Sequence, residues 1–513
     1  MVFNSWQFLV FFPVVTALYF MLTMKLHTPP GSHVFLLLAS LFFYGYWNPW
    51  YLGLILFSVV LTWAGALLIE KIEKIERIVK GAEKAEAGKK LVLGLVLTLN
   101  LGVLFWFKYF NFFAETWYTL AGLLGRTGET AWKKPLEVLL PAGISFYTFQ
   151  ALGYAIDVYR GSVQAERNLL HYALFVTFFP QLVAGPIERT AHLLPQFKVT
   201  QGFDYDRVTS GLRQAAWGMF KKVVVADRLA VYVNAVFDAP GAYPASALAL
   251  GVLFFTFQIY GDFSGYSDIA VGTARVLGFN LSVNFRAPYF SRSIQDFWRR
   301  WHISLSGWLK DYLYIPLGGS RKGCAGVNLL ITFLVSGLWH GAAWHFVVWG
   351  LLHGLFQVAE RALGIRESSG PGKYLQGGLT FVLVSLAWIF FRAHTLSDAL
   401  FISSRLAELP AELAGYIRAL PQTGLVNSVR QAFQLGASQH GVTSPIPQFG
   451  ITQAGLSLIF IAALLVGDWF NQTGRVWVSR LSLVPRWALY YALVFTVFLN
   501  WNRGTSLFIY FTF

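Results

Sequence analysis

Two histidines, His302 and His340, lie in segments where an ionisable side chain is unusual, and His340 is the clearer case. It stands in residues 336–341 (SGLWHG), inside a stretch, 323–359, that contains no Asp, Glu, Lys or Arg. Such a stretch can cross a lipid bilayer, so we expect the imidazole at membrane depth. An ionisable group there is costly unless it faces a cavity or water path, which makes a functional role the default hypothesis. A buried imidazole is expected to stay neutral at pH 7, and a neutral imidazole can accept a proton from a hydroxyl group.

The segment 284–306 (NFRAPYFSRSIQDFWRRWHISLS) places four arginines and His302 beside aromatic side chains. It is too polar to face lipid and too aromatic for a free loop. One interpretation is an anchor at the membrane surface, with Trp and Tyr at the interface and arginines reaching to water. The other is a polar re-entrant element that binds an anionic or phosphate-bearing donor, because the planar guanidinium group suits such ligands. The residue pattern alone leaves both open.

The segment 260–268 (YGDFSGYSD) carries two carboxylates, Asp262 and Asp268, among glycines. A catalytic carboxylate pair is one interpretation. We favour a structural role or a role along the acceptor path, with both carboxylates paired to arginines of 286–300, because buried charges in membranes are normally paired. The glycines would permit a broken helix.

The order of the polar motifs is similar to that of one known family. The central ones are 300–306 (RWHISLS), 312–319 (YLYIPLGG) and 336–341, and the supporting ones are 141–150 (PAGISFYTFQ), 179–187 (FPQLVAGPI), 260–268 and the tail 508–511 (FIYF). This set resembles the membrane-bound O-acyltransferase (MBOAT) superfamily. Within it the chain most resembles the bacterial branch with the membrane subunit of alginate O-acetyltransferase and the D-alanyl transferase of teichoic acids. The resemblance spans nearly the whole chain and is specific for the family, not for the substrate.

The resemblance implies that His340 is the catalytic histidine and His302 the second functional one. His340 would be the general base, and His302 would orient the acceptor, polarise the carbonyl or hold the donor. We expect substrate contacts from a further set of residues: Arg299, Arg300, Trp339, Asp262 and Asp268. No bound cofactor and no metal are expected, and the donor would be an acyl thioester such as acetyl-CoA or an acyl carrier.

The other histidines and the single cysteine, Cys324, are given no chemical role. His345 lies five residues after His340, which does not match the i, i+4 spacing of a helical zinc site. His353 could line the same cavity, but a hydrogen-bonded core histidine is the favoured interpretation.

The composition places these motifs in a membrane protein. The chain has 513 residues, 56% of them hydrophobic and 13% charged, with a mean hydropathy of +0.52. We predict an all-α, polytopic integral membrane protein with ten to thirteen spanning helices plus re-entrant and interfacial helices. The candidate spans are roughly 7–25, 33–47, 51–69, 91–119, 138–157, 169–185, 245–262, 326–359, 377–391, 452–468 and 484–500. The run 326–359 could hold one long helix or two.

The net charge of +15 is interpreted as a topology signal, with no nucleic-acid partner expected. The basic stretch 71–90 should face the cytoplasm, and because three spans precede it, the N-terminus should be extracytoplasmic and uncleaved.

We expect one transmembrane domain over 1–513, made of N-terminal helices (1–140), a catalytic core (141–360) and C-terminal helices (361–513). Residues 203–234 are predicted to form an amphipathic interfacial helix. Residues 395–450, with a helical stretch over 397–420, are the longest predicted excursion from the membrane. This excursion and the tail are candidates for docking a partner.

The sequence therefore predicts an O-acyltransferase of the bacterial cytoplasmic (inner) membrane. It would pass an acyl group, most simply acetyl, from a cytoplasmic thioester across the membrane for O-acetylation of an exported polysaccharide such as alginate. The resemblance implies an extracytoplasmic partner of the serine-esterase-like acetyltransferase type. The alternatives are D-alanyl transfer to teichoic acid and, from a different class, a transporter or flippase of a polar lipid-linked substrate.

Overall fold

The described part of the chain is helical, as predicted. The computed structural model describes residues 1–26, 29–76, 82–123, 140–183, 185–365, 367, 370–436, 446, 448–472, 478–501 and 509. Within these ranges every regular element is a helix, and one isolated bridge joins Leu435 and Ile446. Of the predicted tail motif 508–511, only Ile509 lies inside the described residues.

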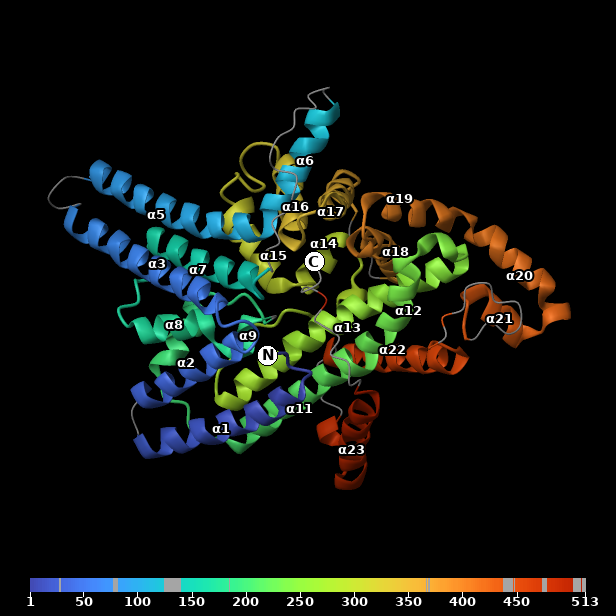
Figure 1. Cartoon of the computed structure of the whole chain (residues 1–513), viewed down its shortest axis with the longest axis horizontal. Helices are drawn as coiled ribbons and strands as arrows, with labels where there is room; N and C mark the ends of the chain where they lie inside the picture. Colours follow the sequence, from blue (N-terminus) through green and yellow to red (C-terminus); the bar gives the residue numbers. More distant parts are fainter. Residues whose placement is uncertain are drawn as a thin grey trace. The chain divides into compact units, whose positions relative to one another are not determined.

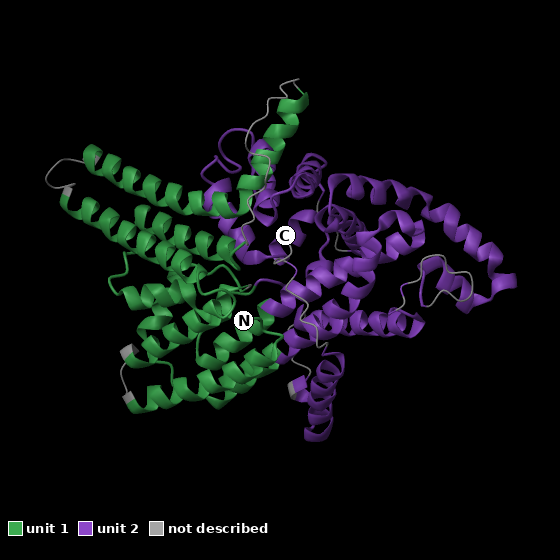
Figure 2. Cartoon of the chain, in the orientation of Figure 1, with its two compact units in different colours: residues 1–215, 267–283 green, residues 216–266, 284–513 purple. Residues whose placement is uncertain are grey.

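The helices form two compact units (Figure 2). Unit 1 holds residues 1–215 and 267–283, and unit 2 holds residues 216–266 and 284–513. Two helices, α11 (Tyr205–Met219) and α13 (Ala245–Leu277), contribute residues to both units.

Unit 1 is built mainly from N-terminal helices. Besides its parts of α11 and α13, its elements are α1 (Trp6–Leu26), α2 (Pro29–Gly45), α3 (Tyr51–Lys71), η1 (Ile72–Glu76), α5 (Ala82–Leu104), η2 (Phe105–Tyr109), α6 (Phe110–Leu123), α7 (Ile144–Tyr159), α8 (Leu169–Thr177), α9 (Phe179–Leu182), α10 (Thr190–Leu193) and η3 (Leu194–Lys198). Helix α3 packs against α5 and α7, and α2 packs against α1 and α8 (Figure 1).

Unit 2 contains every predicted site residue except Asp268, which belongs to unit 1. Its elements are η4 (Phe220–Ala226), α12 (Asp227–Asp238), η5 (Pro240–Ala242), η6 (Pro288–Phe290), α14 (Ile294–Arg300), α15 (Ile303–Leu309), η7 (Lys310–Tyr314), α16 (Ala325–His340), α17 (Trp344–Ala362), α18 (Gly372–Arg392), α19 (Leu396–Arg405), η8 (Leu406–Glu408), α20 (Leu409–Thr423), α21 (Leu425–Phe433), α22 (Ile451–Gln472), η9 (Val478–Arg480) and α23 (Leu483–Asn500). The predicted helical stretch 397–420 corresponds to α19 and most of α20.

Several helices have the length and composition of membrane spans. In the described residues, seven long ones qualify: Trp6–Lys25, Tyr51–Ile75, Glu83–Leu123, Ala245–Leu277, Gly372–Arg392, Ile451–Gln472 and Leu483–Asn500. Three further apolar helices, Gly31–Gly45, Leu169–Leu182 and Ala325–His340, are shorter, and the predicted number of ten to thirteen spans stays a prediction. These helices indicate a multi-pass membrane protein.

Helix α13 is continuous from Ala245 to Leu277, so the break that its glycines would permit does not form. Gly261 and Gly265 instead allow close packing. A Cβ at Gly261 would lie 3.0 Å from the carbonyl oxygen of Lys221, and one at Gly265 would lie 2.8 Å from that of Gly218. Small residues four apart let two helical backbones approach in this way.

The prediction that 203–234 is an interfacial helix is wrong for its centre. Residues 220–226 form the π-helical turn η4, and all seven are buried, including Lys221 and Lys222. The interleaved charges that suggested an amphipathic helix are in part buried within unit 2, where they form ion pairs.

The topology prediction for residues 71–90 can be tested by cysteine labelling. Ala85, at the centre of the basic stretch, is only 2% exposed and would report poorly, whereas Ala87 is exposed. With Cys324 replaced by serine, we expect Ala87→Cys to react with an impermeant maleimide in inverted membrane vesicles but not in intact spheroplasts.

A matched control lies on the other side of one predicted span. Trp50 is 87% exposed, and Tyr51–Ile75 separates it from Ala87. Trp50→Cys should therefore react in intact spheroplasts. The reverse pattern of labelling would contradict the predicted orientation.

Candidate active site

A helical hairpin places His340. The predicted run 326–359 forms two helices, α16 and α17, that pack side by side and are separated by the short link 341–343 (Figure 1). Their closest approach is at Gly337 and Gly350: a Cβ on either glycine would collide with a backbone carbonyl of the opposite helix, at Phe346 and Phe333 respectively. His340, the last residue of α16, follows this crossing by one turn, so the tight crossing fixes its position.

The His340 imidazole is enclosed by aromatic rings and is 2% exposed. Its ring centroid lies 4.9 Å from that of Trp339, 5.0 Å from Trp349 and 5.3 Å from Phe391. Trp349 is on α17 and Phe391 on α18, so three helices contribute to the enclosure. The enclosure leaves almost none of the imidazole surface open to solvent.

His302 lies at a sharp break between α14 and α15. Its backbone is in the left-handed region, with φ of 43° and ψ of 54°. This conformation costs about 1–2 kcal/mol for a residue with a side chain, so packing around the turn must hold it. The side chain is fully buried, with its ring centroid 4.6 Å from Phe263 of α13 and 5.9 Å from Trp339.

The two histidines are neighbours. Their ring centroids lie 6.3 Å apart, and Trp339 contacts both rings. The prediction of one shared site required them to lie within about 15 Å, because groups that act on one reacting centre need contacts near 3 Å. The observed separation meets this requirement.

The predicted arginines are placed differently. The Arg299 side chain is exposed on α14, while Arg300 is half-buried and pairs with Asp296, with 2.9 Å between Nε and Oδ1. The structure thus brings Trp339 and His302 to His340 but does not bring Arg299 to them. The roles of Arg299, Arg300 and Trp339 in substrate binding remain predictions.

The predicted pairing of Asp262 with arginines of 286–300 is wrong. Asp262 instead forms an ion pair with Lys222 and accepts a hydrogen bond from the Ile509 backbone N–H at 2.8 Å. Lys222 also pairs with Asp227, with 2.9 Å between Nζ and Oδ1. Asp268, the other predicted carboxylate, belongs to unit 1 and accepts a hydrogen bond from Gln214 at 3.0 Å.

The remaining histidines of the hairpin have structural contacts. The Trp298 indole N–H donates to His353 Nδ1 at 3.3 Å, which confirms His353 as a hydrogen-bonded core histidine. His345 Nδ1 lies 2.9 Å from the Phe390 carbonyl oxygen. Within the described ranges, no group of three or more His, Cys, Asp or Glu side chains is arranged to hold a metal ion.

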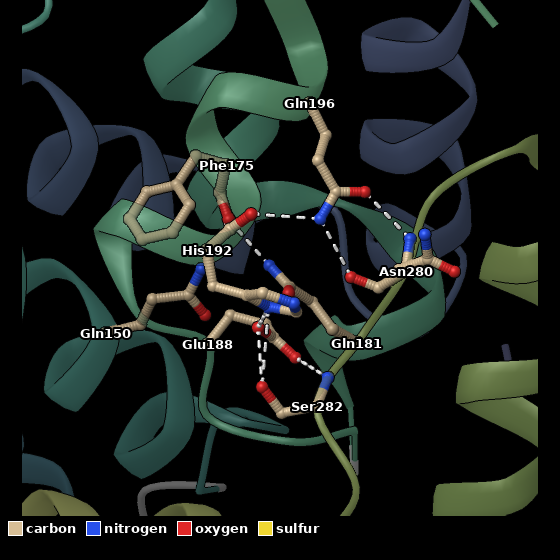
Figure 3. A network of polar contacts seen from close by, with 8 residues as sticks. All are labelled: Gln150, Phe175, Gln181, Glu188, His192, Gln196, Asn280 and Ser282. Carbon is tan, nitrogen blue, oxygen red and sulfur yellow. Dashed lines mark hydrogen bonds and ion pairs between the residues drawn. The ribbon is translucent and has the colours of Figure 1, made fainter.

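Unit 1 contains a second polar cluster, around Glu188 (Figure 3). Glu188 accepts hydrogen bonds from the Ser282 backbone N–H at 2.5 Å and Oγ at 3.1 Å, and lies 2.7 Å from His192 Nδ1. This carboxylate raises the pKa of His192 above its ordinary value. The cluster is not a nucleophilic triad, because serine and carboxylate approach the same ring nitrogen, whereas a triad uses the two nitrogens separately.

Sequence reasoning missed several residues of the site. Phe263, Trp349 and Phe391 enclose the histidines, but buried aromatic residues are common throughout this chain and gave no distinguishing signal. Asn284 was included in the segment 284–306 without a role. It accepts hydrogen bonds at the start of α15, directly beside His302.

Comparison with known proteins identifies the family. Residues 164–365 match the model of the MBOAT, membrane-bound O-acyltransferase family. A probable alginate O-acetylase AlgI of Pseudomonas putida is 39% identical over 402 residues, which cover 78% of this chain and 79% of the relative. The chain belongs to the MBOAT family. It is an O-acyltransferase, and both histidines of the shared site lie in the matched segment.

Two other relatives of the MBOAT chain differ in what their names state. A peptidoglycan O-acetyltransferase of Helicobacter pylori is 38% identical over 435 residues, covering 78% of each chain. A teichoic acid D-alanyltransferase of Streptococcus thermophilus is 28% identical over 236 residues, covering 42% of this chain and 55% of the relative. The likeness to the two O-acetyl-transferring relatives is thus both stronger and longer.

Proposed function

We propose that this chain transfers an acetyl group from a cytoplasmic thioester, across the bacterial inner membrane, for O-acetylation of an exported glycan. The observation that carries this proposal is the buried His302–His340 pair, 6.3 Å apart, in a multi-pass member of the MBOAT family. A neutral imidazole in a dry, aromatic enclosure is suited to accept a proton from an acceptor hydroxyl.

The relatives favour acetyl over D-alanyl as the transferred group. The alginate and peptidoglycan O-acetyltransferases match over 78% of this chain, whereas the D-alanyltransferase matches over 42%. The acceptor class supported by both of the stronger relatives is a cell-envelope polysaccharide. Alginate and peptidoglycan are the two candidates for the final acceptor.

In the proposed reaction His340 is the general base. A ring nitrogen of His340 takes the proton of the acceptor hydroxyl, and the oxygen attacks the carbonyl carbon of the thioester. The tetrahedral intermediate collapses with cleavage of the carbon–sulfur bond, and the thiolate leaves and takes up the proton held by His340. The products are an O-acyl ester and a free thiol.

His302 is proposed to orient the acceptor or the carbonyl. Its ring lies beside both His340 and Trp339, so all three residues can reach one substrate. An extracytoplasmic partner of the serine-esterase-like type would then pass the acetyl group to the glycan.

His302→Gln tests whether His302 acts by hydrogen bonding or by exchanging a proton. Glutamine keeps hydrogen-bonding groups but cannot serve as an acid or base near pH 7, so we expect severe impairment that is smaller than the roughly 10²-fold or greater loss of a general base. His302→Asn is the matched variant, because asparagine tolerates the left-handed backbone of this position. A loss equal to that of His340→Ala in both variants would contradict the orienting role. Initial rates of acyl transfer give the measurement.

The function itself can be tested with inverted membrane vesicles that contain the chain. [¹⁴C]Acetyl-CoA supplied to the exposed cytoplasmic face should label alkali-labile O-esters in the wild type but not in His340→Ala. A parallel reaction with a D-alanyl carrier thioester should give little transfer. Movement of a lipid-linked glycan without any thioester cleavage would instead support the flippase alternative.

A further inference from the structure

His302 occupies the N-cap position of α15 but does not act as a cap. An N-cap residue ordinarily has an extended backbone and a short side chain whose oxygen accepts an N–H of the first turn. His302 has a left-handed backbone, and its side chain makes no capping hydrogen bond. Its ring is directed instead into the aromatic enclosure with Phe263 and Trp339. The first amides of α15 must therefore be satisfied by another residue.

Asn284, which lies 18 residues before His302 in the sequence, caps α15 instead. Its backbone carbonyl accepts the Ile303 N–H at 3.0 Å, and its side-chain Oδ1 accepts the Ser304 N–H at 3.3 Å and the Ser304 O–H at 2.7 Å. Two residues further on, the Arg286 N–H donates to the Arg300 carbonyl at 3.0 Å. Asn284 is itself 1% exposed, so water cannot take over these hydrogen bonds.

We propose that Asn284 is a positioning residue for the acyl-transfer reaction. By capping α15 from a separate segment, it holds the turn at Trp301 and His302, so the His302 side chain is not needed as the cap. This inference rests on the proposed function of the histidine pair. Without Asn284, the first turn of α15 would have to recruit His302 or unwind, and either change would move the imidazole relative to His340.

The test compares Asn284→Ala with Asn284→Asp in full-length protein in inverted membrane vesicles, with [¹⁴C]acetyl-CoA as the probe. Since a displacement near 1 Å can lower a rate by about 10²-fold, Asn284→Ala should lower kcat by about 10-fold or more. The KM for acetyl-CoA should stay within about 2-fold, because a displaced His302 impairs the reacting geometry more than donor binding. Asn284→Asp should recover kcat to within about 3-fold, because a carboxylate oxygen also caps a helix well.

A second helix that is capped by a residue from a distant part of the sequence provides the matched control. Glu412 of α20 accepts the Ala245 N–H at 2.8 Å and the Ser246 O–H at 2.6 Å at the start of α13. Glu412→Ala should lower the unfolding temperature by as much as Asn284→Ala while keeping kcat within about 2-fold of wild type, because it leaves the turn at His302 intact. An equal loss of kcat in both variants would show a general effect of stability and overturn the proposal.

Two further outcomes decide the case. A wild-type kcat in Asn284→Ala, or a failure of Asn284→Asp to recover, would overturn the positioning role. If Asn284→Ala does not accumulate in the membrane, Ser304→Ala replaces it in the test, because it removes the hydroxyl that donates to Asn284 Oδ1 and keeps the Ser304 backbone N–H. Ser304→Ala should lower kcat, and an unchanged kcat would overturn the proposal. His340→Ala in the same assay distinguishes failure of the proposed function from failure of the positioning role. Acyl transfer by His340→Ala would refute the proposed function. An inactive His340→Ala together with a fully active Asn284→Ala would refute only the positioning role of Asn284.

Discussion

His340→Ala is expected to abolish acyl transfer, with a loss of at least about 10²-fold, because it removes the proposed proton acceptor. The structure adds a consequence for folding. His340 contacts Trp339, Trp349 and Phe391 and is nearly inaccessible, so alanine leaves a cavity among aromatic rings. His340→Gln fills more of that space while lacking a basic imidazole, and it should lose activity with a smaller loss of stability.

A second buried histidine of the same hairpin serves as the control. His353 is fully buried and hydrogen-bonded to Trp298, and the proposed reaction does not use it. His353→Ala should lower stability through the lost hydrogen bond and packing but keep its rate per folded molecule. The measurement is acyl transfer from labelled acetyl-CoA, normalised to the folded protein in the membrane. Retained O-acetylation in cells that carry only His340→Ala or His340→Gln would refute the assignment of the base.

The hairpin that carries His340 was largely predictable. A stretch without charges from 323 to 359 required burial in lipid or protein, and a histidine within it required an explanation. The choice between one helix and two was left open. The structure has two helices, and they pack through Gly337 against Phe346 and Gly350 against Phe333, contacts between residues nine and seventeen apart in the sequence.

The proximity of His302 to His340 followed from the family resemblance, but the geometry that produces it did not. The left-handed backbone conformation of His302 cannot be recognised from the sequence, because histidine also occurs in the other allowed backbone conformations. The composition of the segment 284–306 could not show that Arg299 is exposed while His302 is buried. Those facts depend on which face of the short helix α14 packs inward.

The error at residues 203–234 has a physical cause. Charged residues that alternate with aromatic ones produce the same sequence pattern whether the helix lies on a membrane surface or is buried in the protein with its charges in ion pairs. The distinguishing signal lay elsewhere, in the spacing of Gly261 and Gly265. Two glycines four apart on a helix indicate a close backbone contact, and η4, with Lys222, makes that contact.

Lys222→Met is expected to destabilise the protein strongly. Lys222 is 1% exposed and pairs with both Asp227 and Asp262, so its removal leaves carboxylates in the interior without their cation. Removing one partner of a buried ion pair typically costs about 3–5 kcal/mol. Lys90→Met is the matched control, because the Lys90 side chain is 65% exposed and that of its partner Glu86 is 41% exposed, and an exposed pair contributes at most about 1 kcal/mol. Unfolding in detergent and abundance in the membrane measure the difference.

The double variant Lys222→Met/Asp262→Asn separates the structural role of Asp262 from its predicted role in substrate binding. Replacing Lys222 and Asp262 together removes the more buried of the two carboxylates, 4% exposed against 12% for Asp227, so part of the stability should return. The introduced amide still offers an oxygen to the Ile509 N–H, which now donates to Asp262. If Asp262 also binds substrate, the double variant will fold yet transfer acetyl groups poorly; if it is only the partner of Lys222, activity will return with stability. A double variant as unstable as Lys222→Met would instead show that the loss arises at Asp227 or from the fit of the methionine, and not from the lost partner of Asp262.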